Sequence, residues 1–229
     1  MKTCRNPAAV VKVPSARRRT RKVQAWSSEE ARRFLESARA DDDPLYAVYT
    51  LILVLGLRKG EVLGLLWDDI DLDPGELSLG LQLRRVDRRL LHRETKTATS
   101  DDVVLPLVDL CTGALRHRQT QQTQARQAAG AAWRGGKWVF STKWGTPIEP
   151  RNFNRSWDTR CAKGGVRKIT VHDGRRTCAT LLVDLDVHPR EVMRILRHAK
   201  ISMTMEIYAQ ASSNATRAAL KRLGERLDG

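Results

Sequence analysis

Two basic side chains that suit a phosphodiester stand three residues apart in the second half of the chain. His172 and Arg175 form an H-x-x-R pattern within TVHDGRRTCATLL, Thr170 to Leu182. Residues three apart share one face of a helix, and the first turn of a helix presents unpaired backbone N–H groups to an anion. An imidazole and a guanidinium converging there would bind a phosphate. By itself, the pattern is equally typical of exposed residues on a helix surface.

A tyrosine that could act as a nucleophile follows a histidine in LRHAKISMTMEIY, which ends at Tyr208. His198 precedes it, and a Ser/Thr-rich turn with Ser202 and Thr204 is expected between them, followed by a helical stretch. A tyrosine hydroxyl can attack phosphorus and store the bond energy as phosphotyrosine, provided that donors hold the non-bridging oxygens. Taken alone, Tyr208 is better interpreted as a half-buried tyrosine whose hydroxyl meets solvent.

An arginine and a lysine earlier in the chain could complete a phosphate site. Arg58 follows Gly56 at an expected corner between two helices, and Glu61 lies one helical turn further on. Such an arginine can point into a cleft while the carboxylate holds it, whereas an exposed pair contributes little. Lys96 lies in ETKT at an expected hairpin, from which it could deliver a proton in a minor groove. Most hairpin lysines only protect a strand edge.

Helices must position most of these side chains. Ser27 or Ser28 can cap a helix that has Glu29 and Glu30 in its first turn. Pro44 is expected in the first turn of the next helix. Further helices are expected over about 44–55 (ended by Gly56), 59–65 and 107–128. Later helices are expected to carry the face of Cys178, Leu181, Leu182 and Leu185, to open at Pro189, and to carry the face of Leu220, Leu223 and Leu227.

Residues 70–106 have a strand pattern instead. Leu77, Leu79, Leu81 and Leu83 alternate with other residues, which predicts one half-buried strand. Further strands are expected near 90–94 and 102–105. The chain is therefore expected to be mainly α with a small antiparallel β-sheet of about three strands, an α+β fold.

Composition favours a polyanionic partner. The chain has 41 Lys and Arg against 26 Asp and Glu, a net charge of +15, and each phosphate contact releases condensed counterions. A generally basic proteome would give the same excess. No stretch reaches the ~18 apolar residues of a membrane helix, and Cys4, Cys111, Cys161 and Cys178 lack zinc-site spacing. We expect a cytoplasmic protein without metal, cofactor or membrane contact.

The first 25 residues contain eight basic residues and no acidic one. They are expected to form a linker or arm that lies along a DNA backbone, although a solvated tail would have the same composition. The residues predicted to bind DNA here are Arg17, Arg18, Arg19, Arg21 and Lys22.

Together, these blocks resemble the tyrosine recombinase family, also called the phage integrase family. The resemblance rests on GLRKGEVLGLLWDDID from Gly56 to Asp71, TKT around Lys96, and the two blocks quoted above. It requires six polar residues in four separated blocks and covers about residues 26–212. It implies the tyrosine recombinase catalytic-domain fold, the DNA breaking-rejoining enzyme type.

The resemblance also implies which residues bind the scissile phosphate. Arg58 and Arg175 resemble the two phosphate-binding arginines of the family, and His198 resembles the histidine that donates to a non-bridging oxygen. Glu61 resembles the acidic residue that supports the first arginine. Guanidinium and imidazole groups would then neutralise charge that Mg²⁺ handles in many phosphoryl-transfer sites.

The remaining roles concern proton transfer and attack. Tyr208 resembles the nucleophile, which forms a 3′-phosphotyrosine and frees a 5′ hydroxyl. Lys96 resembles the hairpin lysine that protonates the leaving 5′ oxygen, and His172 resembles the general acid/base near the tyrosine.

The chain departs from the family pattern at several positions. Gly174 stands where the family often has Leu and could loosen a helix start by up to ~1 kcal/mol relative to Ala. Arg176 replaces a frequent His and is expected to contact phosphate or to remain solvated. Asp101 and Asp102 replace frequent basic residues and should weaken DNA contact beside Lys96.

The family usually carries an N-terminal core-binding domain of about one hundred residues. We expect this domain to be absent here, so that a basic linker (1–25) precedes the catalytic domain (26–212). An excised fragment, a truncated gene and a short natural variant all fit. The helix expected in 213–229 packs either on a neighbouring protomer or in cis.

The function implied by the resemblance is site-specific recombination of double-stranded DNA, for integration or excision of a mobile element. The implied partners are double-stranded DNA at the nucleoid, further copies of the chain in a DNA-bound tetramer, and accessory DNA-bending proteins. Two alternatives stay open: a catalytically impaired DNA-binding remnant or regulator, and a topoisomerase-like enzyme that relaxes DNA without exchanging partners.

Overall fold

The computed structural model describes residues 25–86, 89–94, 103–198, 200–209 and 223–226. Several predictions concern residues outside these ranges: Arg17, Arg18, Arg19, Arg21, Lys22, Lys96, Asp101, Asp102, and all of 213–229 except 223–226.

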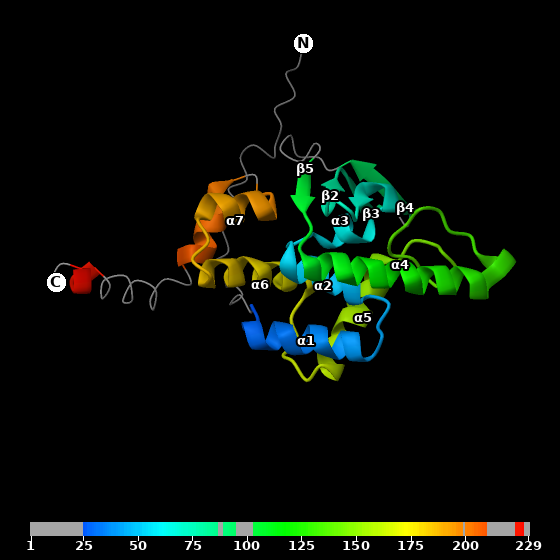
Figure 1. Ribbon diagram of the computed structural model, residues 1–229, viewed down its shortest axis with the longest axis horizontal. Coiled ribbons are helices and arrows are strands. Elements are labelled where there is room, and N and C mark those ends of the chain that lie inside the picture. The colour runs from blue at the N-terminus through cyan, green and yellow to red at the C-terminus, as the bar shows by residue number, and fades with distance from the viewer. Residues whose placement is uncertain (1–24, 87–88, 95–102, 199, 210–222, 227–229) are drawn as a thin grey trace, which may run out of the picture.

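Helices dominate the described part of the chain, as expected (Figure 1). They are α1 (Ser28–Ala40), α2 (Tyr46–Val54), α3 (Lys59–Leu63), α4 (Asp109–Ala129), α5 (Pro150–Lys163), α6 (Val171–Asp184) and α7 (Pro189–Leu196). Further helical residues lie at 201–209 and 223–226, and two 3₁₀ turns at Trp67–Asp69 and Gly130–Ala132. None of the described helices is both long and apolar enough to cross a bilayer.

The central element is α2, which is apolar on every side and buried along almost its whole length. It contacts α1, α4 and α6, and in Figure 1 the helices α4 and α6 extend to either side of it while α1 and α5 lie below. Gly56 ends this segment with a φ of +59°, as the sequence predicts. Pro44 lies in the turn before Leu45, the N-cap of α2, so its expected place in the first helical turn is wrong.

An aromatic cluster joins the N-terminal part of the described chain to α6. The rings of Phe34 and Trp157 contact each other, and each of them also contacts Trp26 and Tyr49. The backbone N–H of Trp26 donates to Thr177 Oγ1 at 3.0 Å. The start of the described chain is thus bound directly to the helix that carries His172 and Arg175. At α1, Ser27 forms the predicted cap as a full capping box.

The strands form two antiparallel sheets. The first sheet has the strand order β1 (Ile70–Asp71), β2 (Glu76–Leu79) and β5 (Val103–Pro106). The second sheet is the hairpin of β3 (Leu81–Val86) and β4 (Arg89–Glu94). The single strand predicted through Leu83 is therefore wrong, because the chain passes from one sheet to the other at Gly80. The leucine alternation continues across this break, so the sequence pattern did not reveal it.

The β3–β4 hairpin packs closely on α3. A Cβ at Gly64 would lie 2.8 Å from Leu83 N, and one at Gly60 would lie 3.0 Å from Leu83 O. The ring of His92 on β4 hydrogen-bonds Gly64 O through Nε2 at 2.9 Å. Two glycines one turn apart therefore let the helix that follows Arg58 lie against the strand backbone. The hairpin that leads toward Lys96 is fixed relative to that arginine.

Gly174, one of the departures from the family pattern, is explained by packing. A Cβ at this position of α6 would lie 2.7 Å from Trp157 Cη2 and 3.3 Å from Ile52 Cγ2. Trp157 is fully buried, and its Nε1 donates to Ile169 O at 2.9 Å. The indole occupies the space that a larger side chain would need.

Gly174→Ala should therefore destabilise the protein although alanine favours helix. We expect the free energy of unfolding to fall by about 1–3 kcal/mol from overpacking. The matched control is Gly113→Ala in α4, where a Cβ has no atom within 4 Å; it should stabilise by up to ~1 kcal/mol. Urea unfolding of both variants measures the difference. Equal stabilisation by both substitutions would contradict the packing explanation.

Candidate active site

Arg58 enters the site from the corner after α2. It is the N-cap of α3, with extended backbone, and follows Gly56 by two residues. A Cβ at Gly56 would lie 2.4 Å from Leu196 Cδ2 and 3.3 Å from Cys178 Sγ. Glycine is thus required there by its positive φ and by close packing against α6 and α7. This turn directs Arg58 toward the C-terminal end of α7, where its Nη2 donates to Arg197 O at 3.0 Å.

Glu61 holds Arg58 from the next helical turn. Arg58 Nη1 lies 2.5 Å from Glu61 Oε1, and the Arg58 backbone N–H donates to Oε2 at 2.8 Å. The Glu61 side chain is only 3% exposed, whereas that of Arg58 is 40% exposed. Burial alone would raise the pKa of Glu61, but Arg197 and Arg58 outweigh it and leave the pKa lowered. The carboxylate therefore stays ionised, while one side of the guanidinium faces the opening.

Arg175 is buried and bound to two backbone carbonyls. Its Nη1 donates to Gly56 O and its Nη2 to Leu196 O. These carbonyls lie just after α2 and at the last residue of α7, where a helix carries partial negative charge. Burial, followed by the charges of Arg58 and Arg197, lowers the pKa of Arg175 to about 9.

The two histidines flank these guanidinium groups. His172 lies in the first turn of α6, after the Thr170 cap, and is exposed as a whole residue. His198 is half-buried, and its Nδ1 hydrogen-bonds Thr204 Oγ1 at 2.9 Å. Desolvation and then Arg175 lower the pKa of both imidazoles, that of His198 to about 4. Both histidines are therefore neutral at pH 7 in the free protein.

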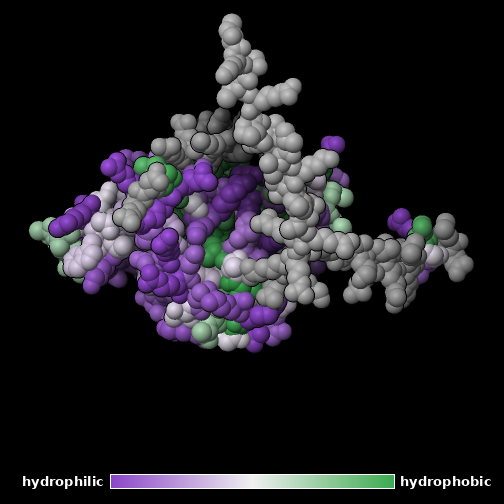
Figure 2. Space-filling model, turned by 180° about the vertical axis from the view of Figure 1, so that it is seen from behind, coloured by the Kyte–Doolittle hydropathy of each residue, from purple (hydrophilic) through white to green (hydrophobic). Residues whose placement is uncertain are grey.

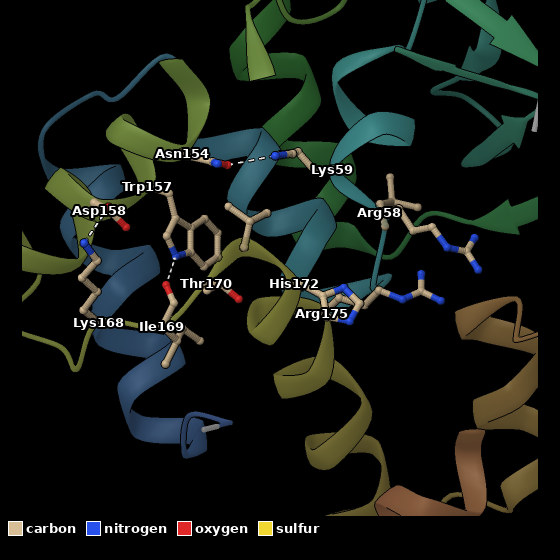
Figure 3. A pocket seen from close by; sticks show the side chains of 12 residues that line it. Arg58, Lys59, Asn154, Trp157, Asp158, Lys168, Ile169, Thr170, His172 and Arg175 are labelled. Atoms are coloured by element: carbon tan, nitrogen blue, oxygen red, sulfur yellow. Dashed lines mark hydrogen bonds and ion pairs between the residues drawn. The ribbon is translucent and has the colours of Figure 1, made fainter. Parts of the chain in front are cut away.

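Four of the six predicted catalytic residues line one pocket of about 230 Å³, namely Arg58, His172, Arg175 and His198. Arg176 also lines it, as its expected phosphate contact requires. A neighbouring cavity of about 640 Å³ shares Arg58, His172 and Arg175 and extends to Trp157 and Lys168. Figure 3 shows the guanidinium groups of Arg58 and Arg175 side by side, pointing away from Trp157. The face seen in Figure 2 is mainly hydrophilic and hollowed near its centre.

Tyr208 is near this pocket, but its hydroxyl is bound elsewhere. The half-buried side chain packs on the cluster that contains Ala179, Val192 and Leu196, and the hydroxyl donates to Val187 O. Burial, followed by Asp186, raises the pKa of Tyr208. The structure thus brings together four of the predicted catalytic residues without the tyrosine oxygen. Lys96 lies outside the described residues.

Sequence reasoning missed two residues of the site. Thr204 was placed in a turn, but it is fully buried within the helix over 201–209 and contacts His198. Arg197 was not singled out, although it directly precedes His198. It is buried against Glu61, with Nη2 at 2.8 Å from Oε2. Adjacency to His198 was the available signal, but the burial of Arg197 depends on a contact with a residue 136 positions away.

Comparison with known proteins identifies the family. The profile of the phage integrase family matches residues 25–215. A tyrosine recombinase XerC-like protein of Caldanaerobacter subterraneus subsp. tengcongensis is 27% identical over 197 residues, covering 81% of this chain and 50% of that protein. The ICEBs1 integrase of Bacillus subtilis is 25% identical and covers 98% of this chain and 59% of that protein. The chain belongs to the phage integrase family and spans about half the length of these curated relatives.

Solved structures show the same fold. The Tn1549 transposon integrase in complex with transposon right end DNA has a TM-score of 0.75 at 20% identity, covering 95% of this chain and 70% of that chain. XerA recombinase has a TM-score of 0.65 at 21% identity, covering 87% and 64%. The predicted tyrosine recombinase fold, mainly α with a small antiparallel sheet, is confirmed.

The lowered pKa of His198 predicts a pH dependence of stability. The unfolded chain takes up a proton near pH 6.5, whereas folded His198 resists protonation down to about pH 4. The unfolded state therefore binds more protons between these values, and stability must fall as the pH drops through this window. His198→Asn should reduce the decrease in Tm between pH 6.5 and 5, a range in which most carboxylates remain ionised. An unchanged slope in this variant would show that His198 titrates normally.

Proposed function

We propose that this chain is the catalytic part of a site-specific DNA recombinase that breaks and rejoins strands through a 3′-phosphotyrosine intermediate. The observation that carries this proposal is the convergence of Arg58, Arg175 and His198 on one pocket of about 230 Å³. The three come from separate segments of the chain, and all can donate to an anion.

Each of these groups suits a particular part of a bound phosphodiester. The exposed side of Arg58 is free to reach a non-bridging oxygen while Glu61 holds the other side. The Thr204 hydroxyl can donate a hydrogen bond to His198 Nδ1. In that tautomer Nε2 carries the proton and can donate to a phosphoryl oxygen. These donors would hold the charge that builds on the phosphoryl oxygens. Arg175 adds a positive charge that its backbone carbonyl partners hold in place.

In the proposed cleavage step, Tyr208 Oη attacks phosphorus and the bond from phosphorus to the 5′ oxygen breaks. The tyrosine proton passes to His172, whose neutral imidazole can accept it. Lys96 protonates the leaving 5′ oxygen. A 5′ hydroxyl from a second strand then reverses the attack, so no external energy source is needed. Before cleavage, the Tyr208 hydroxyl must leave Val187 O.

The proposed substrate is double-stranded DNA, and the net charge of +15 supports a polyanion. The names of the relatives include the ICEBs1 integrase and Tn916 transposase, which favours integration or excision of a mobile element. The similar Tn1549 integrase structures hold transposon right end and circular intermediate DNA. We propose assembly on DNA as a homo-tetramer, with accessory DNA-bending proteins, at the bacterial nucleoid.

A second candidate is a DNA-binding regulator that occupies sites without cutting them. The observation in its favour is the position of the Tyr208 hydroxyl, which is bound to Val187 O and not directed to the pocket. This candidate shares the phosphate-binding groups with the first and differs only in whether the tyrosine reaches phosphorus.

Covalent trapping separates the two candidates. On a duplex with a nick beside the cleavage site, the protein should form a covalent DNA adduct detectable by denaturing electrophoresis. Tyr208→Phe should abolish the adduct because it removes the attacking hydroxyl. It should change the DNA Kd by less than about threefold, because at most one hydrogen bond is lost. Tyr46→Phe, a buried tyrosine away from the pocket, is the matched control and should still form adduct. Binding by the wild type without adduct supports the regulator, and adduct formation by Tyr208→Phe sinks the nucleophile assignment.

A further inference from the structure

Arg197 combines several features that are unfavourable for an arginine. Its side chain is only 3% exposed, and its backbone is in the left-handed region with φ 53° and ψ 48°, which favours glycine. Its Nε is buried and has no hydrogen-bond partner in the described part of the chain. Strained backbone and buried charge at one position persist only where the surroundings over-determine them. The residue is therefore a candidate for a role in the site.

Arg197 contacts the Arg58–Glu61 pair through both its side chain and its backbone. Its Nη2 lies 2.8 Å from Glu61 Oε2, and its Nη1 donates to Ile195 O at 2.8 Å. Its own carbonyl accepts from Arg58 Nη2 at 3.0 Å. Both the side chain and the backbone of Arg197 thus contact the Arg58–Glu61 pair, and His198 is the next residue.

Glu61 is consequently shared between two guanidinium groups. Oε1 lies 2.5 Å from Arg58 Nη1. Oε2 accepts two hydrogen bonds of 2.8 Å, one from Arg197 Nη2 and one from the Arg58 backbone N–H. Arg58, Arg175 and Arg197 together with this carboxylate carry a net charge of +2. Without Arg197, Oε2 would keep only the Arg58 backbone N–H, and the carboxylate charge would act on Arg58 alone within this pair.

We propose that Arg197 is a positioning residue, which fixes Glu61 and thereby the orientation and charge of Arg58 toward the scissile phosphate. This inference rests on the proposed function. It predicts that Arg197 acts on the cleavage step more than on DNA affinity, because its buried side chain contacts Glu61 and does not line the pocket.

The test is single-turnover adduct formation on the nicked duplex, at saturating DNA and well below the Tm of each variant. Arg197→Met should lower the saturated rate by at least about tenfold and alter the DNA Kd by less than about threefold. Arg194→Met is the matched control, since it removes the same charge from an exposed position of α7. Its saturated rate should stay within about twofold of wild type.

A double-mutant cycle with Glu61→Gln distinguishes positioning from simple stabilisation. If Arg197 acts through the Glu61 carboxylate, Arg197→Met should lower the rate by a smaller factor in the Glu61→Gln background than in wild type. Arg197→Lys keeps a charge that can reach Glu61 and should recover part of the rate. Equal factors in both backgrounds would overturn the proposal.

The failure of this inference differs from failure of the proposed function. If wild type and Arg194→Met form adduct and Arg197→Met cleaves at the wild-type rate, the positioning role is wrong and the recombinase function stands. If wild type forms no adduct, the proposed function fails, and the inference fails with it. Should Arg197→Met not fold, Arg197→Lys decides: a reduced saturated rate at unchanged Kd supports the proposal, and the wild-type rate overturns it.

Discussion

The structure depends on holding the guanidinium groups of Arg58, Arg175 and Arg197 close together, two of them buried. Removing charge from water is costly unless it is paired and hydrogen-bonded. Here a single carboxylate, Glu61, is divided between Arg58 and Arg197, and Arg175 has backbone carbonyls as partners instead. These carbonyls lie at the C-terminal ends of α2 and α7, where the helix dipoles are negative. Helix placement thus provides much of the compensation that a second carboxylate would otherwise supply.

This arrangement keeps the pocket electropositive without filling it. A second acidic partner would balance the guanidinium charges but would also compete with phosphate. Backbone carbonyls hold Arg175 without adding a full negative charge. The same positive field, together with burial, keeps His198 neutral with a pKa of about 4. An anion bound among these groups would offset that field and favour the protonated imidazole. Protonation of His198 and binding of an anion there would therefore be coupled.

The scaffold explains why these groups can meet. Arg58 lies after a turn that only glycine tolerates, and α6 approaches α2 and α5 closely because Gly174 leaves room for Trp157. The aromatic cluster fixes α1 and α5 on the same core, and the backbone of Trp26 is bound to Thr177 of α6. The helix over 201–209 is anchored through the Thr204–His198 hydrogen bond and the contact of Tyr208 with Val187. The tyrosine therefore belongs to a helix that contributes no residue to the main core and packs on the smaller cluster with Val192 and Leu196.

Much of the local structure around the site residues could be predicted from the amino-acid sequence. Local hydrogen bonds and backbone preferences between residues close in sequence determine four such features. They are the helix cap at Ser27, the helix end at Gly56, the start of α7 at Pro189 and the Arg58–Glu61 pair. Only tertiary structure decided the break at Gly80, the burial of Arg197 and the direction of the Tyr208 hydroxyl. The Arg58–Arg197 contact joins residues 139 positions apart, and a leucine pattern that continues across Gly80 does not indicate which sheet each strand joins. Such choices depend on which distant surfaces pack together, and that information is not local to any segment of the chain.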